Sequence, residues 1–418
     1  MRILLLHSSS DIYGASKIFL QTVKLLQQQG HTTVVALSSE GPLSVELEKL
    51  GVEVQIINLA ILRRKYFNVS GIINRYQKWG AAVKALSALI DSHQIDTVYS
   101  NTAAVLVGGY IARKKNLQHI WHVHEIIEKP VFLHTFLASR LRNWADKIIV
   151  VSKAVEAHWQ DALPKGRNAT PTMHQIYNGL PAINDTPNTS SDHTLSLRNK
   201  LSIPSDAILI GMAARIHFWK GQTYFIDIAK ALLHRAQQNK NNEHQPPLYF
   251  IIAGDPFPGY EHLQVEMEKA ILDNALSDRV FYVGLVEDMA LFYRSIQLLI
   301  LPSQQPDPLP TVVLEAMQYG LPVAATAQGG ALEMVIGELN EAENLLNNKV
   351  HPATGIFIPL NDSRVAAEKI ESILPIEKLQ SLGEAGKKRV EHFFSAAAFE
   401  KNILAVFEQP IRDRKSVV

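Results

Sequence analysis

Two carboxylates, Asp307 and Glu315, flank a proline-rich turn in the stretch PDPLPTVVLEAM. The stretch follows QLLILPS (297–303), an apolar run that is typical of a buried strand. Pro310 suits the first position of a helix, where a fixed φ helps and a missing N–H does no harm. We therefore expect a helix from about 310 to 319, with Asp307 before it and Glu315 about one and a half turns inside. The two acids are either a by-product of amphipathicity or the lining of a site.

The N-terminus of this expected helix would offer unpaired N–H groups between the two acids, and such groups bind phosphate. A ligand with an anion in its middle and hydroxyl groups at both ends would fit this arrangement. A nucleoside diphosphate sugar is such a ligand. On this interpretation Glu315 binds the ribose hydroxyls and Asp307 contacts the sugar.

Two cations, Arg215 and Lys220, lie in the segment GMAARIHFWKGQ (211–222), after an expected strand and before a helix start at Gly221. A guanidinium and an ammonium next to a helix N-terminus form an anion site that suits a diphosphate. An exposed basic turn is the plainer explanation. The position directly after a strand favours a site, because α/β sheets bind ligands at the carboxyl ends of their strands.

Three glycines also follow expected strands. Gly14 precedes a helical pattern in SSSDIYGASK (8–17), while Gly254 and Gly284 end the runs LYFIIAG and RVFYVG. Glycine lets backbone approach a phosphate or a planar ligand closely. A helix cap and two ordinary turns explain these glycines equally well, and neither the dinucleotide fingerprint nor a Walker A sequence is present.

A histidine pair, His122 and His124, ends the run HIWHVHE (119–125), and strand alternation places both side chains on one face. A hydrogen-bonded pair at a strand end is one explanation. A metal site would need a third ligand, and the sequence offers none at useful spacing. His124 is therefore a candidate contact for a sugar or a phosphate.

Apolar runs of strand length alternate with amphipathic segments of helix length, which predicts doubly wound parallel sheets. The chain has 418 residues, more than one core usually serves. The alternation stops at PAINDTPNTSSDHTLSLRNK, a polar linker at 181–200. We expect an α/β protein with two Rossmann-like domains, 1–190 and 200–395, that face a central cleft. A C-terminal helix in 396–418 is expected to return to the first domain.

Positive charge is concentrated in the first domain, although the net charge is only +1. Residues 60–170 hold sixteen Lys or Arg against seven Asp or Glu, with aromatic residues interleaved. Such a surface could bind anionic lipid, a charged acceptor or nucleic acid, and a solvated helical face explains it as well. We place the membrane or acceptor contact at Arg63, Arg64 and Lys65.

The absence of cysteine excludes disulfides and thiolate metal sites and fits a cytoplasmic protein. No run of about 18 apolar residues predicts a spanning helix, and the N-terminal run is too short for a signal peptide. We therefore expect a cytoplasmic protein, located at the inner membrane face if its basic surface binds lipid.

The chain resembles the retaining GT-B glycosyltransferases of family 4, whose motif is E-x7-E and here reads D-x7-E. The resemblance covers nearly the whole chain in the family's order and spacing. Its motifs are DIYGAS (11–16), WHVHE (121–125), IIVVSKAV (148–155), IYNG (176–179), AARIHFWKG (213–221), IIAG (251–254), LPS (301–303), DPLPTVVLEAMQYGLPV (307–323) and GGALE (329–333). It implies the GT-B fold and transfer of a sugar from a nucleotide-diphosphate donor to a hydroxyl acceptor, with retention of the anomeric configuration.

The resemblance also implies roles for matching residues. The catalytic group would comprise Asp307, His124, Arg215 and Lys220, with His124 on the transferred sugar and the two cations on the diphosphate.

The donor-binding group implied by the resemblance adds residues from both domains. Glu315 would bind the ribose, and the amides of Thr311 and Val312 would cap the β-phosphate. Gly14 would lie near the donor phosphate and the acceptor, Gly254 in the donor site, and Gly284 beside the nucleobase.

Two departures from the family pattern affect the site. Asp307 replaces a glutamate and reaches about one methylene less far, and Pro310 stands where a glycine with an N–H is frequent. No Asp-x-Asp triplet occurs, so we expect no metal and no other cofactor, with Arg215 and Lys220 supplying the positive charge. The expected partners are a nucleotide sugar and a saccharide or lipid-linked saccharide of cell-surface polysaccharide assembly, not nucleic acid.

Two other classes of function remain open from the residues. A nucleotide-sugar epimerase or hydrolase on the same fold would need a general acid–base pair beside the sugar. A catalytically weak nucleotide-binding protein would not need Arg215, Lys220 and Glu315 together.

Overall fold

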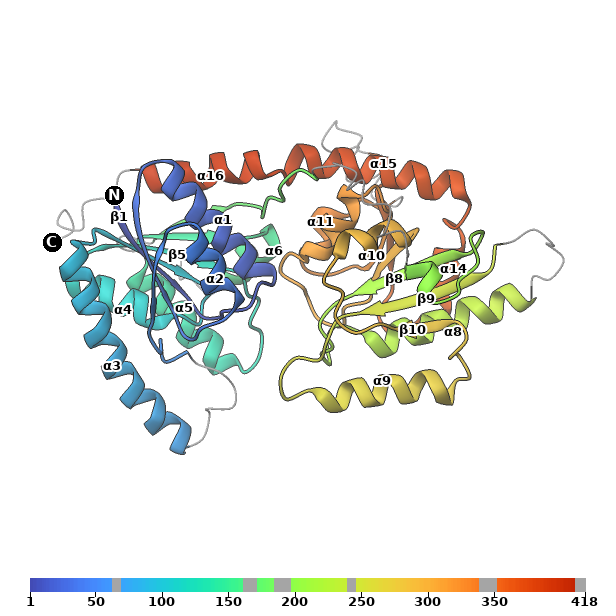
Figure 1. The fold of residues 1–418 in the computed structure, drawn as a ribbon, viewed down its shortest axis with the longest axis horizontal. Coiled ribbons are helices and arrows are strands. Elements are labelled where there is room, and N and C mark those ends of the chain that lie inside the picture. Colours follow the sequence, from blue (N-terminus) through green and yellow to red (C-terminus); the bar gives the residue numbers. More distant parts are fainter. Residues whose placement is uncertain (62–68, 161–170, 184–196, 239–245, 338–351, 410–418) are drawn as a thin grey trace. The chain divides into compact units, whose positions relative to one another are not determined.

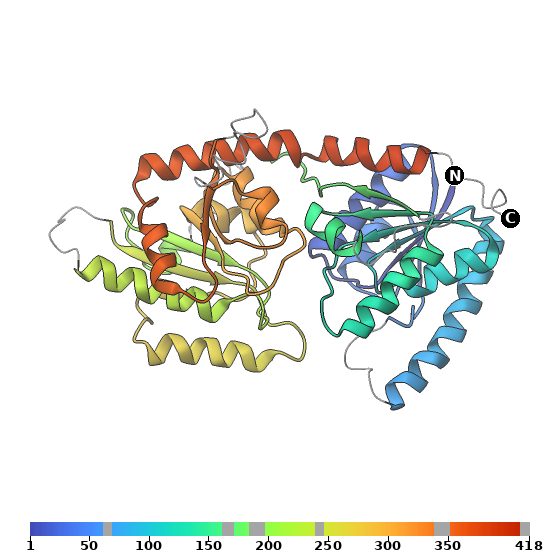
Figure 2. The same ribbon diagram turned by 180° about the vertical axis from the view of Figure 1, so that it is seen from behind.

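The computed structural model describes residues 1–61, 69–160, 171–183, 197–238, 246–337 and 352–409 (Figures 1 and 2). The chain divides into two compact units. The N-terminal unit comprises Met1–Gly179 and Ala396–Val418, and the C-terminal unit comprises Leu180–Ser395. The division falls at the start of the polar segment 181–200 rather than near residue 190. Arg63, Arg64 and Lys65, which we expected to contact a membrane or acceptor, lie outside the described residues.

The N-terminal unit is built on a parallel sheet, which has seven strands within the described residues, in the order β3-β2-β1-β4-β5-β6-β7. The strands are β1 (Arg2–His7), β2 (Thr32–Leu37), β3 (Glu53–Ile56), β4 (Thr97–Asn101), β5 (Gln118–Val123), β6 (Lys147–Val150) and β7 (Thr172–Gln175). Most of these strands are apolar runs because helices cover both faces of a parallel sheet.

Helices pack on both faces of this sheet (Figure 1). They are α1 (Gly14–Gln28), α2 (Pro42–Lys49), α3 (Val69–His93), α4 (Leu106–Lys115), α5 (Val131–Trp144), α6 (Lys153–Gln160) and α16 (Ala396–Glu408). Successive residues of β1 point alternately to the two faces of the sheet and pack in different cores. Ile3 and Leu5 share a core with α1, α2 and α16, whereas Leu4 and Leu6 share another with α3 and α4.

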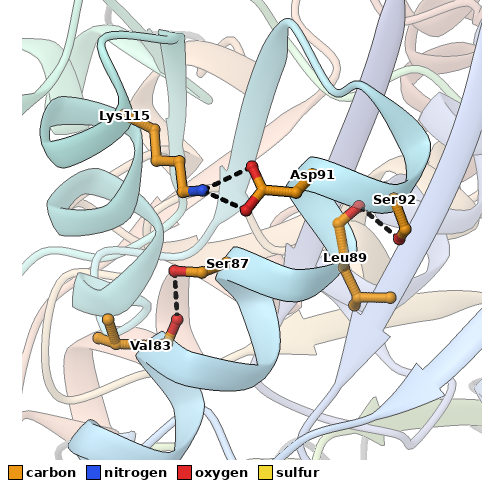
Figure 3. Close-up of polar contacts among 6 residues, drawn as sticks. All are labelled: Val83, Ser87, Leu89, Asp91, Ser92 and Lys115. Atoms are coloured by element: carbon orange, nitrogen blue, oxygen red, sulfur yellow. Dashed lines mark hydrogen bonds and ion pairs between the residues drawn. The ribbon is translucent and has the colours of Figure 1, made fainter.

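Two lysines hold helices of the N-terminal unit in place, one at the end of α16 and one between α3 and α4. Lys147 Nζ donates to the carbonyl oxygens of Val406 (2.6 Å) and Gln409 (2.5 Å) at the C-terminal end of α16. Figure 3 shows Lys115 of α4 bound to both carboxylate oxygens of Asp91 in α3, each at 2.6 Å. The first lysine satisfies carbonyl groups that a helix end leaves unpaired, so it fixes α16 on the N-terminal unit.

The C-terminal unit repeats this plan with a parallel sheet in the order β10-β9-β8-β11-β12-β13, counted over the described residues. The strands are β8 (Ile208–Ala213), β9 (Leu248–Ala253), β10 (Val280–Tyr282), β11 (Leu298–Leu301), β12 (Val323–Thr326) and β13 (Gly355–Ile358). The helices are α7 (Leu197–Lys200), α8 (Gln222–Gln238), α9 (Glu261–Asp273), α10 (Met289–Ser295), α11 (Thr311–Gln318), α12 (Ala331–Met334), α14 (Ser363–Glu371) and α15 (Ile376–Phe393).

The order of strands reverses once in each sheet. In the N-terminal unit the reversal lies between β1 and β4, and in the C-terminal unit between β8 and β11. The loops that leave the two strands turn to opposite faces there, so a crevice opens at their carboxyl ends. Functional side chains are therefore expected at these two points, each within its own unit. Within the described residues, no helix is long and apolar enough to span a membrane.

Candidate functional site

The loops after β8 and β11 meet at the strand-order reversal of the C-terminal unit. Lys220 Nζ lies 2.5 Å from Asp307 Oδ2, and Asp307 is only 7% exposed. Lys220 also lies 4.0 Å from the centroid of the Trp219 ring. The structure thus joins two predicted catalytic residues that are 87 positions apart in the chain. The pairing itself was not predicted.

Arg215 belongs to the same loop and is held by its surroundings. Its carbonyl oxygen accepts a hydrogen bond from Gln222 Nε2 (3.0 Å), and its guanidinium carbon lies 5.6 Å from the centroid of the Phe257 ring. The next residue, Ile216, forms a parallel bridge with Pro256. The loops after β8 and β9 therefore contact each other at Ile216 and at the Arg215 side chain, and these contacts hold the position of Arg215.

At Gly254 and Gly221 the backbone of a neighbouring loop lies so close that there is no room for a Cβ atom. Gly254 has φ +123°, and a Cβ on it would lie 2.1 Å from the carbonyl oxygen of Ala214. Gly221 has φ +83°, and a Cβ there would lie 2.0 Å from the carbonyl oxygen of Pro302. We predicted that Gly254 lets the backbone approach a ligand. That role stays a prediction. The structure shows a further reason for glycine here, because the neighbour that needs the space is the loop that carries Arg215.

A second pair of glycines, Gly329 and Gly330, encloses Asp307 from the other side. The N–H of Gly330 donates to the carbonyl oxygen of Asp307 (2.7 Å). A Cβ on Gly329 would lie 2.4 Å from that same oxygen, and one on Gly330 would lie 2.2 Å from the carbonyl oxygen of Pro308. Asp307 is thus fixed by backbone as well as by Lys220. The segment GGALE was part of the family resemblance, but we had given its glycines no role.

Helix α11 begins at Thr311, with Pro310 as its N-cap residue, and ends at Gln318, as the sequence predicted to within one residue. Thr311 and Val312 occupy the first turn, where N–H groups have no partner inside the helix. One turn further, Glu315 Oε2 accepts a hydrogen bond from the hydroxyl group of Tyr293 (2.7 Å). Tyr293 is buried in α10, and burial followed by the Glu315 charge holds the pKa of its hydroxyl well above the ordinary value. It therefore donates to Glu315 as a neutral phenol.

Gly284 follows β10 with φ +65° and accepts a hydrogen bond from the N–H of Gly254 (2.7 Å) at its carbonyl oxygen. A Cβ on Gly284 would meet only Asp255 Oδ1, at 3.6 Å. Space around Gly284 is thus open, unlike that around Gly254. This agrees with the role predicted for Gly284 beside a nucleobase and does not test it.

Two predicted residues of the N-terminal unit, Gly14 and His124, lie near its own strand-order reversal. Gly14 is the first residue of α1, and a Cβ on it would meet nothing within 4 Å. His124 follows β5, and its Nε2 lies 2.8 Å from Asn101 Oδ1. Asn101 in turn reaches His7 Nδ1 with Nδ2 (2.9 Å). His7 and Asn101 were not predicted, although each ends a strand and the two are register partners of β1 and β4.

Burial keeps these histidines uncharged near neutral pH. Loss of solvent lowers the pKa of His7 to about 4 and that of His122 to about 3. It also holds the pKa of His124 well below the ordinary value, with His122 and His7 adding to the effect. The rings of His122 and His124 lie 4.1 Å apart, as expected for residues on one face. Neutral imidazoles can both donate and accept hydrogen bonds, which suits sugar hydroxyls better than phosphate.

The C-terminal arrangement can bind an anion, since two cations and the first turn of a helix lie at one sheet edge. No group of three or more His, Asp or Glu side chains placed to hold a metal ion occurs in the described part of the chain. A separate cavity of about 1320 Å³ lies around Ile208 and Leu248. These residues begin β8 and β9, so this cavity is at the opposite end of the sheet from the predicted residues.

Two family models match the chain, one in each unit. The model described as Glycosyltransferase Family 4 matches residues 12–181, and that described as Glycosyl transferases group 1 matches residues 194–389. Together they span the predicted residues of both units.

Curated relatives and solved structures point the same way. A lipopolysaccharide 1,2-N-acetylglucosaminetransferase of Salmonella typhimurium is 27% identical over 54% of this chain and 52% of its own length. The lipopolysaccharide core biosynthesis mannosyltransferase LpsB of Rhizobium meliloti is 23% identical over 70% of this chain and 80% of its own. The structure of Anabaena HepE in complex with UDP and glucose matches with a TM-score of 0.76 and 22% identity, over 98% of this chain and 100% of that one. WaaG, a glycosyltransferase involved in lipopolysaccharide biosynthesis, matches with a TM-score of 0.66 and 14% identity, over 98% of this chain and 100% of its own.

Proposed function

Because this chain belongs to the family 4 glycosyltransferases and has the GT-B fold, we propose that it transfers a sugar from a nucleoside diphosphate donor to a hydroxyl group of a saccharide. The anomeric configuration is retained, and no metal ion is needed. The acceptor belongs to cell-surface polysaccharide or lipid-linked glycan assembly. The names of the two curated relatives support this acceptor class, since both refer to lipopolysaccharide.

One observation carries the proposal: Lys220 binds Asp307 across the strand-order reversal of the C-terminal sheet. Arg215 belongs to the same loop as Lys220, and α11 begins four residues after Asp307. The barrier to transfer is the departure of the nucleoside diphosphate, whose oxygens gain charge as the bond to the anomeric carbon breaks. Cations and helix N–H groups that are already in place stabilise that charge without rearrangement. Asp307 holds Lys220 through Oδ2, which leaves Oδ1 for a hydroxyl group of the sugar.

In the proposed reaction the bond between the anomeric carbon and the diphosphate oxygen breaks. The acceptor oxygen forms its bond to the same face of that carbon, and its proton passes to the departing phosphate oxygen. No enzyme nucleophile is required, and Asp307 orients the sugar. Glu315 takes the ribose, steadied by Tyr293. Retention is tested by the anomeric NMR signals of donor and product, and an inverted product would contradict this mechanism.

The proposed function is tested first by measuring whether the protein binds a nucleotide. We expect calorimetry with UDP, GDP, dTDP and ADP to show binding of one nucleotide, equally without and with magnesium. Arg215→Ala should weaken it by about tenfold or more, since a charge-assisted contact to phosphate contributes about 1.5–3 kcal/mol.

A matched control for that measurement is Lys269→Ala, which removes an exposed positive charge from α9 of the same unit. It should leave the affinity unchanged. Absence of binding for all four nucleotides would contradict the proposed function. Binding that Arg215→Ala does not weaken would contradict the assigned anion site.

Contact with an anionic membrane is part of the proposal, and the described residues offer a surface for it. Val131 and Phe132 begin α5 and are 69% and 63% exposed. Phe136 is also exposed, and the guanidinium carbon of Arg140 lies 5.1 Å from the centroid of the Phe136 ring. Exposed apolar side chains beside cations on a helix are typical of binding at the surface of an anionic bilayer.

Replacing Val131 and Phe132 together by serine is expected to lower co-sedimentation with phosphatidylglycerol vesicles several-fold, because two apolar side chains no longer enter the bilayer. The control is the serine pair at Val265 and Leu272 on α9, which are 65% and 67% exposed in the C-terminal unit. Equal losses for both pairs, or no loss for the first, would contradict contact through α5.

A further inference from the structure

We propose that Asn101 is a positioning residue that holds His124 in the Nε2–H tautomer, so that Nδ1 of His124 accepts a hydrogen bond from a hydroxyl group of the bound saccharide. This inference rests on the proposed function for its ligand. It goes further by naming the atom of His124 that meets the ligand and the residue that determines it. All the groups involved belong to the N-terminal unit.

The orientation of the Asn101 amide follows from its neighbours. Its Nδ2 lies 3.3 Å from the carbonyl oxygen of Ala15 and 2.9 Å from His7 Nδ1. A carbonyl oxygen can only accept, so the amide atom facing Ala15 must be the nitrogen. Oδ1 then faces His124 Nε2 at 2.8 Å. Because Oδ1 has no proton to give, His124 must carry one on Nε2.

The protons on the other side of Asn101 agree with this assignment. Nδ2 donates to His7 Nδ1, so His7 is protonated on Nε2 and donates to Ser16 Oγ (2.9 Å). The hydroxyl group of Ser16 is then free to donate to Asp11 Oδ1 (3.2 Å). Each hydrogen bond in the series that runs from Asp11 through Ser16, His7 and Asn101 to His124 thus has one donor and one acceptor.

The opposite orientation of the amide would break this pattern. Oδ1 would face the carbonyl oxygen of Ala15, and two acceptors repel each other at that distance. His7 would have to donate through Nδ1 and accept from Ser16 through Nε2. Ser16 could then no longer donate to Asp11, which would lose a hydrogen bond.

His124 is left with an acceptor atom for a ligand. Within the described residues Nδ1 of His124 makes no hydrogen bond, and the His124 side chain is only partly buried. The ring of His124 packs at a tilt against that of His122, which is fully buried. Burial holds the pKa of His124 well below the ordinary value, so Nδ1 keeps its lone pair at neutral pH. A neutral acceptor binds a hydroxyl group and repels phosphate.

The backbone around Asn101 is also held in place. Thr102 has φ +91°, which is rare for a β-branched residue. Its N–H donates to the carbonyl oxygen of His122 (2.8 Å), and its own carbonyl oxygen accepts from Trp121 Nε1 (2.8 Å). A strained conformation that is fixed on both sides is frequent where a neighbouring side chain must be placed accurately.

The tautomer can be measured without any substrate. In the full chain with ¹⁵N-labelled histidine, we expect His124 to show a protonated Nε2 and an unprotonated Nδ1, with His124→Gln identifying its signals. Asn101→Asp keeps an oxygen facing His124 and should keep Nε2 protonated, although its second oxygen then faces the carbonyl oxygen of Ala15. Asn101→Leu removes it and should give a mixture of both. A wild-type His124 protonated on Nδ1, or an unchanged tautomer in Asn101→Leu, would overturn the proposal.

Kinetics then distinguish positioning from a general structural role. Asn101→Leu is expected to lower kcat/KM by about tenfold, since a misaligned hydrogen bond costs about that much. In a His124→Ala background the same change should cost less than about twofold, because the residue that it positions is absent. A full tenfold loss in both backgrounds would overturn the proposal. If the protein transfers no sugar at all, the proposed function fails, and the NMR result still decides the tautomer.

Discussion

Replacing Lys220 by alanine is expected to lower the rate of sugar transfer by about 10²- to 10³-fold, the range for removing one preorganised group that stabilises transition-state charge. It should also destabilise the C-terminal unit. Asp307 is 7% exposed and would lose the ammonium 2.5 Å away. Breaking a buried pair costs about 3–5 kcal/mol. We expect the free energy of unfolding to fall by about 2–4 kcal/mol here, because the Lys220 side chain is 19% exposed and the pair is not fully buried. The measurements are initial rates and denaturant unfolding.

The double variant Lys220→Ala with Asp307→Asn separates these two effects. It removes the uncompensated carboxylate, so most of the lost stability should return, while transfer should stay at the low level of the single variant. Recovery of activity along with stability would show that Lys220 acts only as the partner of Asp307. Unchanged stability in the single variant would show that solvent already compensates Asp307.

The sequence predicted the strands well because parallel strands that are buried on both faces are continuous apolar runs. RILLLH coincides with β1, and LYFIIAG extends one residue beyond β9. The edge strand β7 (Thr172–Gln175) is half-buried and begins two residues before HQIYNG (174–179), the run in which the sequence predicts a strand. Helix α7 (Leu197–Lys200) falls inside the segment we had interpreted as linker. In both places the pattern was weak because little apolar surface is buried.

The sequence supplied candidate residues for the site but not the contact between Lys220 and Asp307. Lys220 and Asp307 were each chosen for one ligand, but their pairing depends on the reach of two side chains across the β8–β11 reversal. The sequence does not indicate His7 and Asn101, because a single histidine and a single asparagine have no motif spacing. The available signal was topological, since each ends a strand and β1 and β4 are neighbours. Whether the predicted residues carry out the proposed chemistry stays a prediction.

Replacing Gly254 by alanine is expected to impair the enzyme severely, although Gly254 supplies no side chain to the chemistry. The new Cβ would lie 2.1 Å from the carbonyl oxygen of Ala214 and 3.4 Å from the N–H nitrogen of Arg215, at a φ of +123°. The loop that carries Arg215 must then move. Displacing a binding group by about 1 Å can cost about 10²-fold in rate. We therefore expect a fall of about 10²-fold in kcat/KM, measured with the nucleotide sugar that calorimetry identifies.

Gly259→Ala is the matched control, because it separates backbone strain from collision. Gly259 lies in the same loop and also has a positive φ, +91°, yet a Cβ on it would meet nothing within 4 Å. Alanine there should cost about 1 kcal/mol of stability and leave transfer within about twofold of wild type. Equal losses at Gly254 and Gly259 would mean that strain alone matters. A much larger loss at Gly254 would show that the contact between the β8 and β9 loops determines where Arg215 stands. The contribution of Arg215 to transfer would then depend on the absence of a side chain at Gly254 as well as on the guanidinium charge.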